Sequence, residues 1–155
     1  MNFLLDAVIA GTIAGIATTA AAATAARRQG APAVAPVNAV SHVVWGDEAG
    51  HQDGLSARYT ATGFATNHAA CVFWAAVYEA LRRRVGAGVP GAVASGPTVA
   101  ALAYFVDYHL VPKRLTPGYE LRLSAGGLSA IYAALALSLP LWSIFSRRSV
   151  FSDRG

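Results

Sequence analysis

Charged residues are scarce in this chain, and their scarcity argues against a soluble globular protein. Asp, Glu, Lys and Arg make up only 13% of the 155 residues, whereas 55% are hydrophobic. In soluble domains about a quarter of the residues are charged. Because the few charges also lie mostly at the ends of apolar stretches, we expect an integral membrane protein.

Cysteine is almost absent too, and the single Cys71 excludes an intramolecular disulfide. It lies inside an apolar stretch, which predicts a small buried side chain rather than a reactive thiol. The chain also lacks the motifs of several enzyme classes: the phosphate-binding glycine-rich loop, the Gly-x-Ser-x-Gly elbow, the Cys-x-x-Cys pair and His-Glu-x-x-His. No enzyme class is therefore indicated by a motif.

Four long apolar stretches dominate what is present. They run from Phe3 to Ala26, from Tyr59 to Leu81, from Val89 to Val111 and from Leu123 to Phe145. A helix needs about 20 apolar residues to cross the hydrocarbon core of a bilayer. We therefore expect one all-α domain over residues 1–155, a bundle of four transmembrane helices embedded in the lipid bilayer.

The first stretch could also be read as a cleaved signal peptide, because small residues follow it at positions 31–33. A signal peptide has a basic segment before its apolar core. Here no Lys or Arg precedes the stretch, and Asp6 is acidic. We expect a retained helix.

A shorter apolar segment lies in the connection between the first two stretches. Val37, Val40 and Val44 recur at helical spacing, with polar residues between them. This pattern is typical of an amphipathic helix on the membrane surface, and Trp45 is a residue that favours that interface. The sequence predicts an interfacial helix over residues 36–45.

Basic residues do not decide the orientation of the chain in the membrane. Four spans place both termini on one side, and the 12 basic residues then divide equally, six to each side. The densest cluster, Arg82 to Arg84, favours cytoplasmic termini in an inner (plasma) membrane. The net charge of +4 is spread over span ends rather than one basic face, so no nucleic-acid partner is expected.

Small residues form ridges along three of the stretches. Gly11 and Gly15 form a Gly-x-x-x-Gly motif in the first, Gly96 lies on a ridge of the third and Gly126 on a ridge of the fourth. Such ridges let helices approach closely. We expect packing within the chain, with a homo-oligomer or another membrane protein as the alternative. Pro97 predicts a kink in the third stretch.

Ionisable residues inside the spans are the candidates for function, because charge within a bilayer is expensive. His68 is expected near the middle of the second span and Asp107 near the end of the third, facing inward. His109 lies about 200° from Asp107 around the helix, so the two are not expected to share a site. Glu79 is expected to pair with the arginines that follow it.

Acidic and imidazole groups gather on the side of the membrane where the first and third connections lie. The expected polar site consists of His42, Asp47, His68 and Asp107. A Zn or Fe site would use His42, Glu48, His51, His68 and Asp107. Glu48 and His51 have the Glu-x-x-His spacing of di-iron bundles, but no second such motif is present. No cofactor is therefore expected.

Three functions remain open at this point. The first is a non-enzymatic accessory or small-ligand-binding component of the membrane. The second is a metal-dependent membrane enzyme that uses the five residues of the metal set. The third is proton or solute transport along His68, Glu79 and Asp107.

Two segments carry a resemblance to known sequences. One is Ser41-His-Val-Val-Trp-Gly-Asp-Glu, continuing into Thr62-Gly-Phe-Ala-Thr-Asn-His-Ala; the other is Val106-Asp-Tyr-His-Leu-Val-Pro-Lys-Arg-Leu-Thr-Pro-Gly-Tyr-Glu. Together they resemble small, uncharacterised bacterial inner-membrane proteins with four transmembrane helices, over most of the chain after the first stretch. The resemblance implies a bacterial membrane setting and carries no activity with it.

Overall fold

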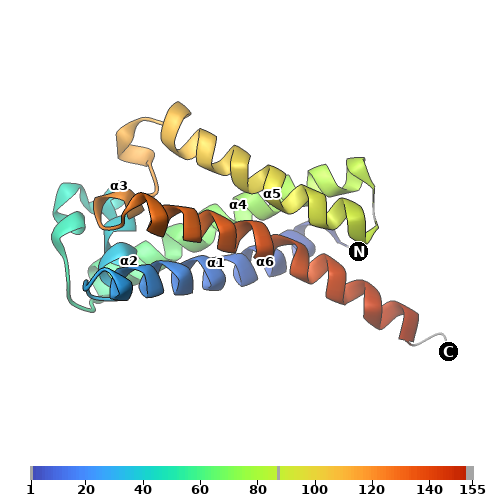
Figure 1. The fold of residues 1–155 in the computed structure, drawn as a ribbon, viewed down its shortest axis with the longest axis horizontal. Coiled ribbons are helices and arrows are strands. Elements are labelled where there is room, and N and C mark those ends of the chain that lie inside the picture. Colours follow the sequence, from blue (N-terminus) through green and yellow to red (C-terminus); the bar gives the residue numbers. More distant parts are fainter. Residues whose placement is uncertain (1, 87, 153–155) are drawn as a thin grey trace.

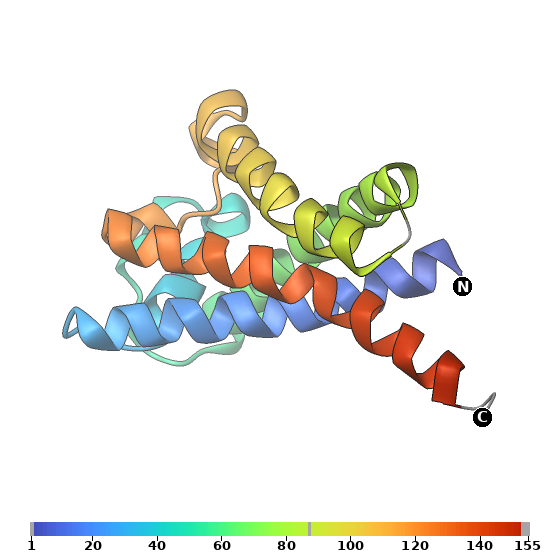
Figure 2. The same cartoon turned by 45° about the vertical axis from the view of Figure 1, so that its right-hand side comes forward.

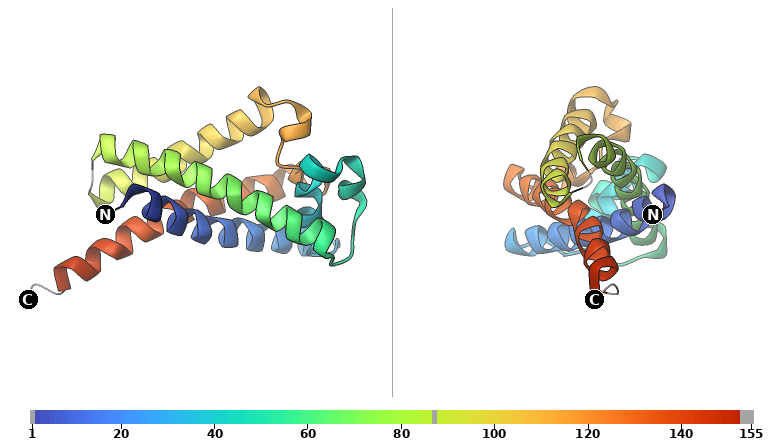
Figure 3. Two further views of the ribbon diagram at one scale, coloured as in Figure 1. Left: turned by 180° about the vertical axis from the view of Figure 1, so that it is seen from behind. Right: turned by 90° about the vertical axis from the view of Figure 1, so that its right-hand side faces the viewer.

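The computed structural model describes residues 2–86 and 88–152 and shows an all-helical protein (Figure 1). Its long helices are α1 (Phe3–Arg28), α4 (Thr62–Val85), α5 (Val89–Phe105) and α6 (Ala125–Ser152). Consecutive long helices run in opposite directions (Figure 3). The N-terminus, the α4–α5 connection and the C-terminal part of α6 therefore lie at one end, the terminal end. Residues 29–61 and 106–124 lie at the other, the loop end.

Three helices of the described chain are long and apolar enough to cross a membrane. They are Phe3–Arg28, Val89–Leu110 and Ala125–Ser146. The predicted span over residues 59–81 is not among them: α4 has 24 residues but is not apolar enough to count by composition. The reason is its polar content, since Asn67, His68 and Glu79 interrupt its apolar residues.

Helix α1 packs closely on α4 because it presents glycine to that helix. A Cβ atom built on Gly11 would lie 2.5 Å from the Cα atom of Val72. One built on Gly15 would lie 3.3 Å from Nδ1 of His68. Both glycines of α1 therefore face α4, and this ridge of small residues packs against another helix of the same protein.

Helix α5 packs on α6 through Gly96, where an added Cβ would overlap the carbonyl oxygen of Ala136. The predicted ridge on α6 is corrected, because Gly126 is exposed and nothing but Ser124 Oγ, at 3.9 Å, lies near it. The next residue, Gly127, faces α1 instead: its added Cβ would lie 3.4 Å from Cβ of Ala25. Towards the loop end, α5 diverges from α1 (Figure 2).

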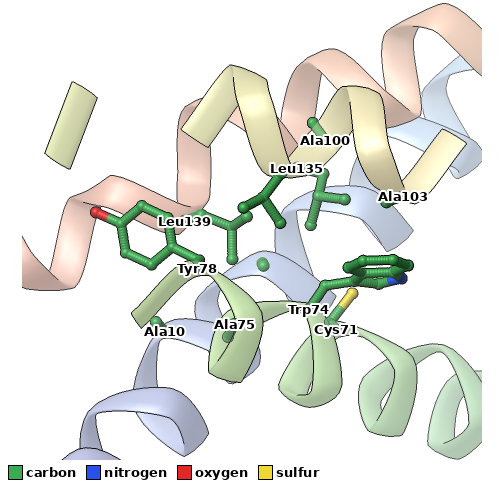
Figure 4. Close-up of a cluster of buried hydrophobic side chains, with 11 residues drawn as sticks. Ala10, Cys71, Trp74, Ala75, Tyr78, Ala100, Ala103, Leu135 and Leu139 are labelled. Atoms are coloured by element: carbon green, nitrogen blue, oxygen red, sulfur yellow. The ribbon is translucent and has the colours of Figure 1, made fainter. Parts of the chain in front are cut away.

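Small residues on α1 and α5 make room for large side chains from α4 and α6 (Figure 4). Trp74 and Tyr78 of α4 and Leu135 and Leu139 of α6 fill the space between the helices. The hydroxyl groups of Tyr78 and Ser143 lie 2.7 Å apart, so the buried phenol is hydrogen-bonded. Because lipid is as apolar as these side chains, close packing rather than water exclusion holds such a bundle together.

The predicted interfacial helix is also corrected. It forms two short helices, α2 (Ala35–Val40) and α3 (His42–Trp45). All six residues of α2 are buried, so it does not lie on a membrane surface. It is inserted against α1 and α4, and an added Cβ on Gly63 of α4 would overlap the carbonyl oxygen of Val37. Only α3 presents exposed apolar side chains.

Asn38 in the middle of α2 ties the following loop to this helix. Its amide nitrogen donates to the carbonyl oxygens of Gln52, at 3.0 Å, and Gly54, at 2.9 Å. Its amide oxygen accepts from the hydroxyl of Thr60 at 2.6 Å. Because the buried amide is fully bonded, it can remain in the interior without the penalty of an unpaired polar group.

Short irregular turns complete the loop end. They are the 3-10 turns η1 (Asp47–His51), η4 (Lys113–Leu115) and η5 (Tyr119–Leu121), and the π-helical turns η2 (Ala57–Ala61) and η3 (Val106–Leu110). Helix α5 is α-helical on both sides of Pro97, the residue at which a kink was predicted. It departs from α geometry only at Val106, where η3 begins.

Candidate functional site

Glu79 pairs with arginines of its own helix, as predicted. It is fully buried, and its carboxylate accepts from Nη2 of Arg82 at 2.6 Å and from Nε of Arg83 at 3.5 Å. Arg83 also reaches Asp6 of α1 at 3.2 Å, and Asp6 accepts from Nε1 of Trp142 at 2.9 Å. Two carboxylates and two guanidinium groups balance in charge. This set, the terminal clamp, therefore fastens α1, α4 and α6 together.

His42, the first residue of the predicted polar site, connects α2 to the segment that follows η3. It is buried, and its Nδ1 and Nε2 atoms lie 3.0 Å and 3.4 Å from the carbonyl oxygens of Ala39 and Lys113. An added Cβ on Gly118 would lie 2.6 Å from the same ring. The imidazole is thus enclosed by backbone, and it joins α2 to the 113–118 segment.

The other three predicted site residues lie in separate surroundings. Asp47 is exposed. His68 lies against α1 at Gly15 and stacks on Phe64, with ring centroids 6.4 Å apart. Asp107 is half-buried and lines a small cavity described below. The structure therefore does not assemble His42, Asp47, His68 and Asp107 into one site.

The five predicted metal ligands are not brought together either. Glu48 accepts from the Tyr59 hydroxyl at 2.8 Å, and the His51 ring lies 3.1 Å from the Asp47 carbonyl oxygen. Within residues 2–86 and 88–152, no three His, Cys, Asp or Glu side chains form a group that could hold a metal ion. Glu48 and His51 lie on a 3-10 turn rather than a helix, so the spacing lacks the geometry of a helical Glu-x-x-His motif.

The strongest candidate site is a small cavity between α1, α4, α6 and the segment before η5. Its volume is about 50 Å³. A water molecule needs about 10–15 Å³ of such space, so the cavity is large enough for a few waters or one small ligand. Its polar lining residues are Thr18, Asn67, Cys71, Asp107, Tyr119 and Tyr132.

Asp107 reaches this cavity from the π-helical turn η3. Single π-helical turns are rare and occur frequently at functional sites. The carboxylate accepts from the Tyr132 hydroxyl at 2.7 Å, but it is in none of the four ion pairs of the described chain. His109 stacks on Phe105 instead, with ring centroids 5.2 Å apart, and is exposed. The two residues occupy different surroundings, as predicted.

Tyr119 presents a polar group without a partner. Its side chain lines the cavity and is 3% exposed. Its hydroxyl makes no hydrogen bond within the part of the chain that the structure describes. A buried polar group left unpaired costs about 1–3 kcal/mol, and native proteins satisfy nearly all of them. Burial raises the pKa of Tyr119 above its ordinary value, so at neutral pH this hydroxyl is uncharged.

Asn67 of α4 and Thr18 of α1 also line the cavity. The amide nitrogen of Asn67 donates to the Thr18 hydroxyl at 3.1 Å and the Thr19 hydroxyl at 3.2 Å. Its amide oxygen has only the thiol of Cys71, at 3.9 Å, which is a weak donor. Asn67 therefore links two helices and leaves an oxygen acceptor available beside the cavity.

A second carboxylate adds negative charge near Asp107. Glu120 accepts from the Tyr108 hydroxyl at 3.1 Å and from the Thr116 hydroxyl. Its charge acts on Asp107 unfavourably. The surroundings of the cavity thus hold two carboxylates, several hydroxyl groups and aromatic rings, and the lining contains no Lys, Arg or His. Such a site favours a small positively charged ligand.

Sequence reasoning chose His68 on α4, whereas the structure buries the preceding residue. The buried face of α4 includes Gly63, Asn67, Cys71 and Trp74, which follow i+4 and i+3 spacing. That spacing could have identified Asn67. Tyr119 carried no such signal, because its approach to Asp107 depends on how residues 111–124 fold back over the bundle.

Known proteins add no constraint on this site, and its interpretation rests on its own chemistry. No protein family, curated protein or solved structure matches the chain.

Proposed function

We propose that this protein is a non-enzymatic component of the bacterial inner membrane that binds a small monovalent cation, of about the size of ammonium, in the cavity beside Asp107. The observation that carries the proposal is that one small cavity is lined by a carboxylate without a counter-charge and by a hydroxyl without a hydrogen-bond partner in the described chain. Asp107 has no cationic partner in the described chain, and the Tyr119 hydroxyl has no partner of any kind there.

A bound cation would supply a counter-charge for Asp107 and a partner for the Tyr119 hydroxyl. Asp107 is half-buried, and withdrawing a carboxylate from water costs free energy unless a positive charge neutralises it. The tyrosine oxygen can accept from an ammonium ion or coordinate an alkali ion. The amide oxygen of Asn67 and the hydroxyl of Thr18 line the same space and offer further oxygen atoms. The rings of Trp74 and Tyr132 also line it, and aromatic faces attract cations.

The charge of the site favours a monovalent ion. Calcium sites supply six to eight oxygen ligands, usually with several carboxylates, and magnesium keeps an octahedral shell of similar demand. In this cavity Asp107 is the single lining carboxylate, and about 50 Å³ of space does not admit an ion together with a full shell of waters.

Thermal unfolding of the detergent-purified protein tests the proposal. Ammonium, sodium and potassium chloride would be compared with N-methylglucamine chloride, whose cation is too large for the cavity, at equal ionic strength. A ligand that binds only the folded state raises the unfolding temperature with its concentration. We expect at least one small cation to do so, and Asp107→Asn to remove the shift.

Asp47→Asn is the matched control, because Asp47 is an exposed carboxylate outside the cavity. Its small-cation shift should equal that of the unmodified chain. If all four salts act alike, or if Asp107→Asn retains the shift, the cavity holds only water and the cation assignment is wrong.

We also propose that α4 crosses the membrane as a fourth span. Its polar residues Asn67 and Glu79 are buried in the bundle, while Phe64 and Phe73 are exposed. The surface that α4 offers to its surroundings is thus partly apolar despite its composition, and the helix lies alongside α1 and α5 (Figure 3). Both termini would then lie on one side, which we assign to the cytoplasm.

Introduced cysteines distinguish three spans from four. In a Cys71→Ser background, Asn2→Cys, Gly54→Cys and Gly88→Cys would be labelled in whole cells with a thiol reagent that does not cross membranes. Four spans place Gly88 on the same side as Asn2, and Gly54 on the other. If Gly88 is instead labelled together with Gly54, α4 does not cross.

A further inference from the structure

A groove of about 430 Å³ runs between α1 and α6 near the loop end and is separate from the cavity beside Asp107. Its α6 wall is formed by Ser124, Gly126, Gly127 and Ala130. Its α1 wall is formed by Ala20, Ala21, Thr24, Ala25, Arg28 and Gln29. Both helices are among those long and apolar enough to cross a membrane, so the groove opens where lipid is expected.

The lining changes from polar to apolar along the groove. Its outer part holds Arg28, Gln29 and Ser124, and the Gln29 amide oxygen accepts from the Ser124 backbone nitrogen at 3.1 Å, which places these two at one level. Ala20 lies eight residues before Arg28, about 12 Å deeper at 1.5 Å per residue. Ala20 and Ala130 make the inner part apolar. A ligand that fits this gradient is polar at one end and apolar at the other.

Charge identifies the polar end of that ligand. Arg28 is exposed and takes part in none of the ion pairs that the described residues form. No Asp or Glu lines the groove. The adjacent Arg27 and the C-terminal position of both arginines on α1 place two positive charges at the expected level of the lipid headgroups.

We propose that this groove binds a phospholipid with an anionic headgroup, with the phosphate at Arg28 and one acyl chain between α1 and α6. The glycine and alanine residues that line the groove have small side chains, so they leave room for an acyl chain between the two helices. Basic residues between membrane helices are a recurrent way of holding anionic headgroups. The proposal is independent of the cation site, since the two sites share no lining residue.

Native mass spectrometry of the purified protein in detergent tests this assignment. Phosphatidylglycerol and phosphatidylcholine with identical acyl chains would be titrated separately, and glycerol 3-phosphate would serve as the headgroup without a chain. We expect retained phosphatidylglycerol, weaker phosphatidylcholine and no glycerol 3-phosphate. Arg28→Gln should weaken phosphatidylglycerol binding about fivefold, the factor expected for one basic residue near an anionic surface.

Arg27→Gln is the matched control, because Arg27 is equally basic but does not line the groove. Gly126→Leu tests the apolar part: nothing but Ser124 lies within 4 Å of an added Cβ, so the side chain can fill the groove without disturbing the helices. Ala130→Leu, at another exposed lining position, provides a second obstruction. We expect both to block the lipid.

Three results would overturn the lipid assignment. Equal weakening by Arg27→Gln and Arg28→Gln would mean diffuse attraction to a basic surface. Binding of glycerol 3-phosphate as strong as that of the lipid would mean a phosphate site without a lipid chain. Full binding by folded Gly126→Leu and Ala130→Leu would mean that the chain lies elsewhere.

Discussion

The two ends of the bundle differ in how their interior carboxylates are paired. At the terminal end, Asp6 and Glu79 are bonded to arginines, so every charge of the terminal clamp has a partner of opposite sign. At the loop end, Asp107 is bonded to a tyrosine hydroxyl and has no ion pair in the described chain. Paired charges hold helices in place. The carboxylate without a counter-charge beside a cavity is the feature on which the proposed cation site rests.

The ends also differ in backbone regularity. Helices α1 and α4 contribute the terminal clamp from regular α-helical segments. The cavity residues come from α1, α4, α6, a π turn and a 3-10 turn. Regular helices are sufficient to hold a neutral set of ion pairs, whereas irregular turns direct side chains from separate segments into one space.

The largest effect is expected from Glu79→Leu in the terminal clamp. This substitution leaves Arg82, which is 2% exposed, without its closest partner. Breaking a buried ion pair from one side costs about 3–5 kcal/mol, measurable by equilibrium unfolding in detergent. The double variant Glu79→Leu, Arg82→Leu should recover much of the loss, and Arg84→Ala, at an exposed position, should change little. An unaltered unfolding curve for Glu79→Leu would remove the structural role of the clamp.

The next effect is expected from Gly63→Ala at the loop end. The new methyl group would overlap the Val37 carbonyl oxygen, so α2 must move away from α4. Overpacking of this kind costs about 1–3 kcal/mol. Gly54→Ala is the control, because nothing lies within 4 Å of its added Cβ. Equal unfolding free energies for the two variants would show that α2 is not wedged against α4.

A change of sign between the ends is expected for two matched substitutions, Asp6→Asn and Asp107→Asn. In a buffer without small cations, Asp107→Asn removes a half-buried carboxylate that has no ion pair in the described chain and should stabilise the fold by about 1 kcal/mol. Asp6→Asn removes one of the two carboxylate partners of Arg83 and should destabilise the fold by about the same amount. Unfolding free energies that fall in both variants would contradict the contrast between the two ends of the bundle.

The smallest pair of effects concerns two buried tyrosines. Tyr78→Phe loses the hydrogen bond to Ser143 and should cost about 1 kcal/mol. Tyr119→Phe removes a hydroxyl without a partner in the described chain and should be neutral or stabilising by less than about 1 kcal/mol when no ligand is present. A loss at Tyr119 as large as at Tyr78 would indicate that a bound group already satisfies the hydroxyl.

Local interactions account for what could be predicted. Glu79 and its arginines are three and four residues apart on one helix, so their pairing follows from helical geometry. The opposite orientations of Asp107 and His109 follow from their spacing, and the glycine contacts of α1 follow from a local motif. The cavity could not be predicted in this way, because Asp107, Tyr119 and Tyr132 come from three segments that meet only after the 111–124 connection has folded back.

The failed predictions have a related cause. The valine spacing in residues 36–45 indicates a helix but not what covers it, and the glycine at position 63 lets α4 cover it completely. The sequence does place small residues at four-residue spacing through Gly126. In the structure, however, α1 packs against the next residue, Gly127. Glu48 and His51 have suitable spacing, but they lie on a 3-10 turn, and no third donor of the described residues joins them in a group that could hold a metal ion.

The sequence by itself determined the helical class of this protein, its apolar segments and the charges that end them, because these depend on composition and on periodicity within single segments. Tertiary structure alone decided which polar groups would share a space, which of them would be paired and which glycines would face a neighbour. Those outcomes depend on contacts between distant segments, where a shift of one residue along a helix turns a side chain by about 100°.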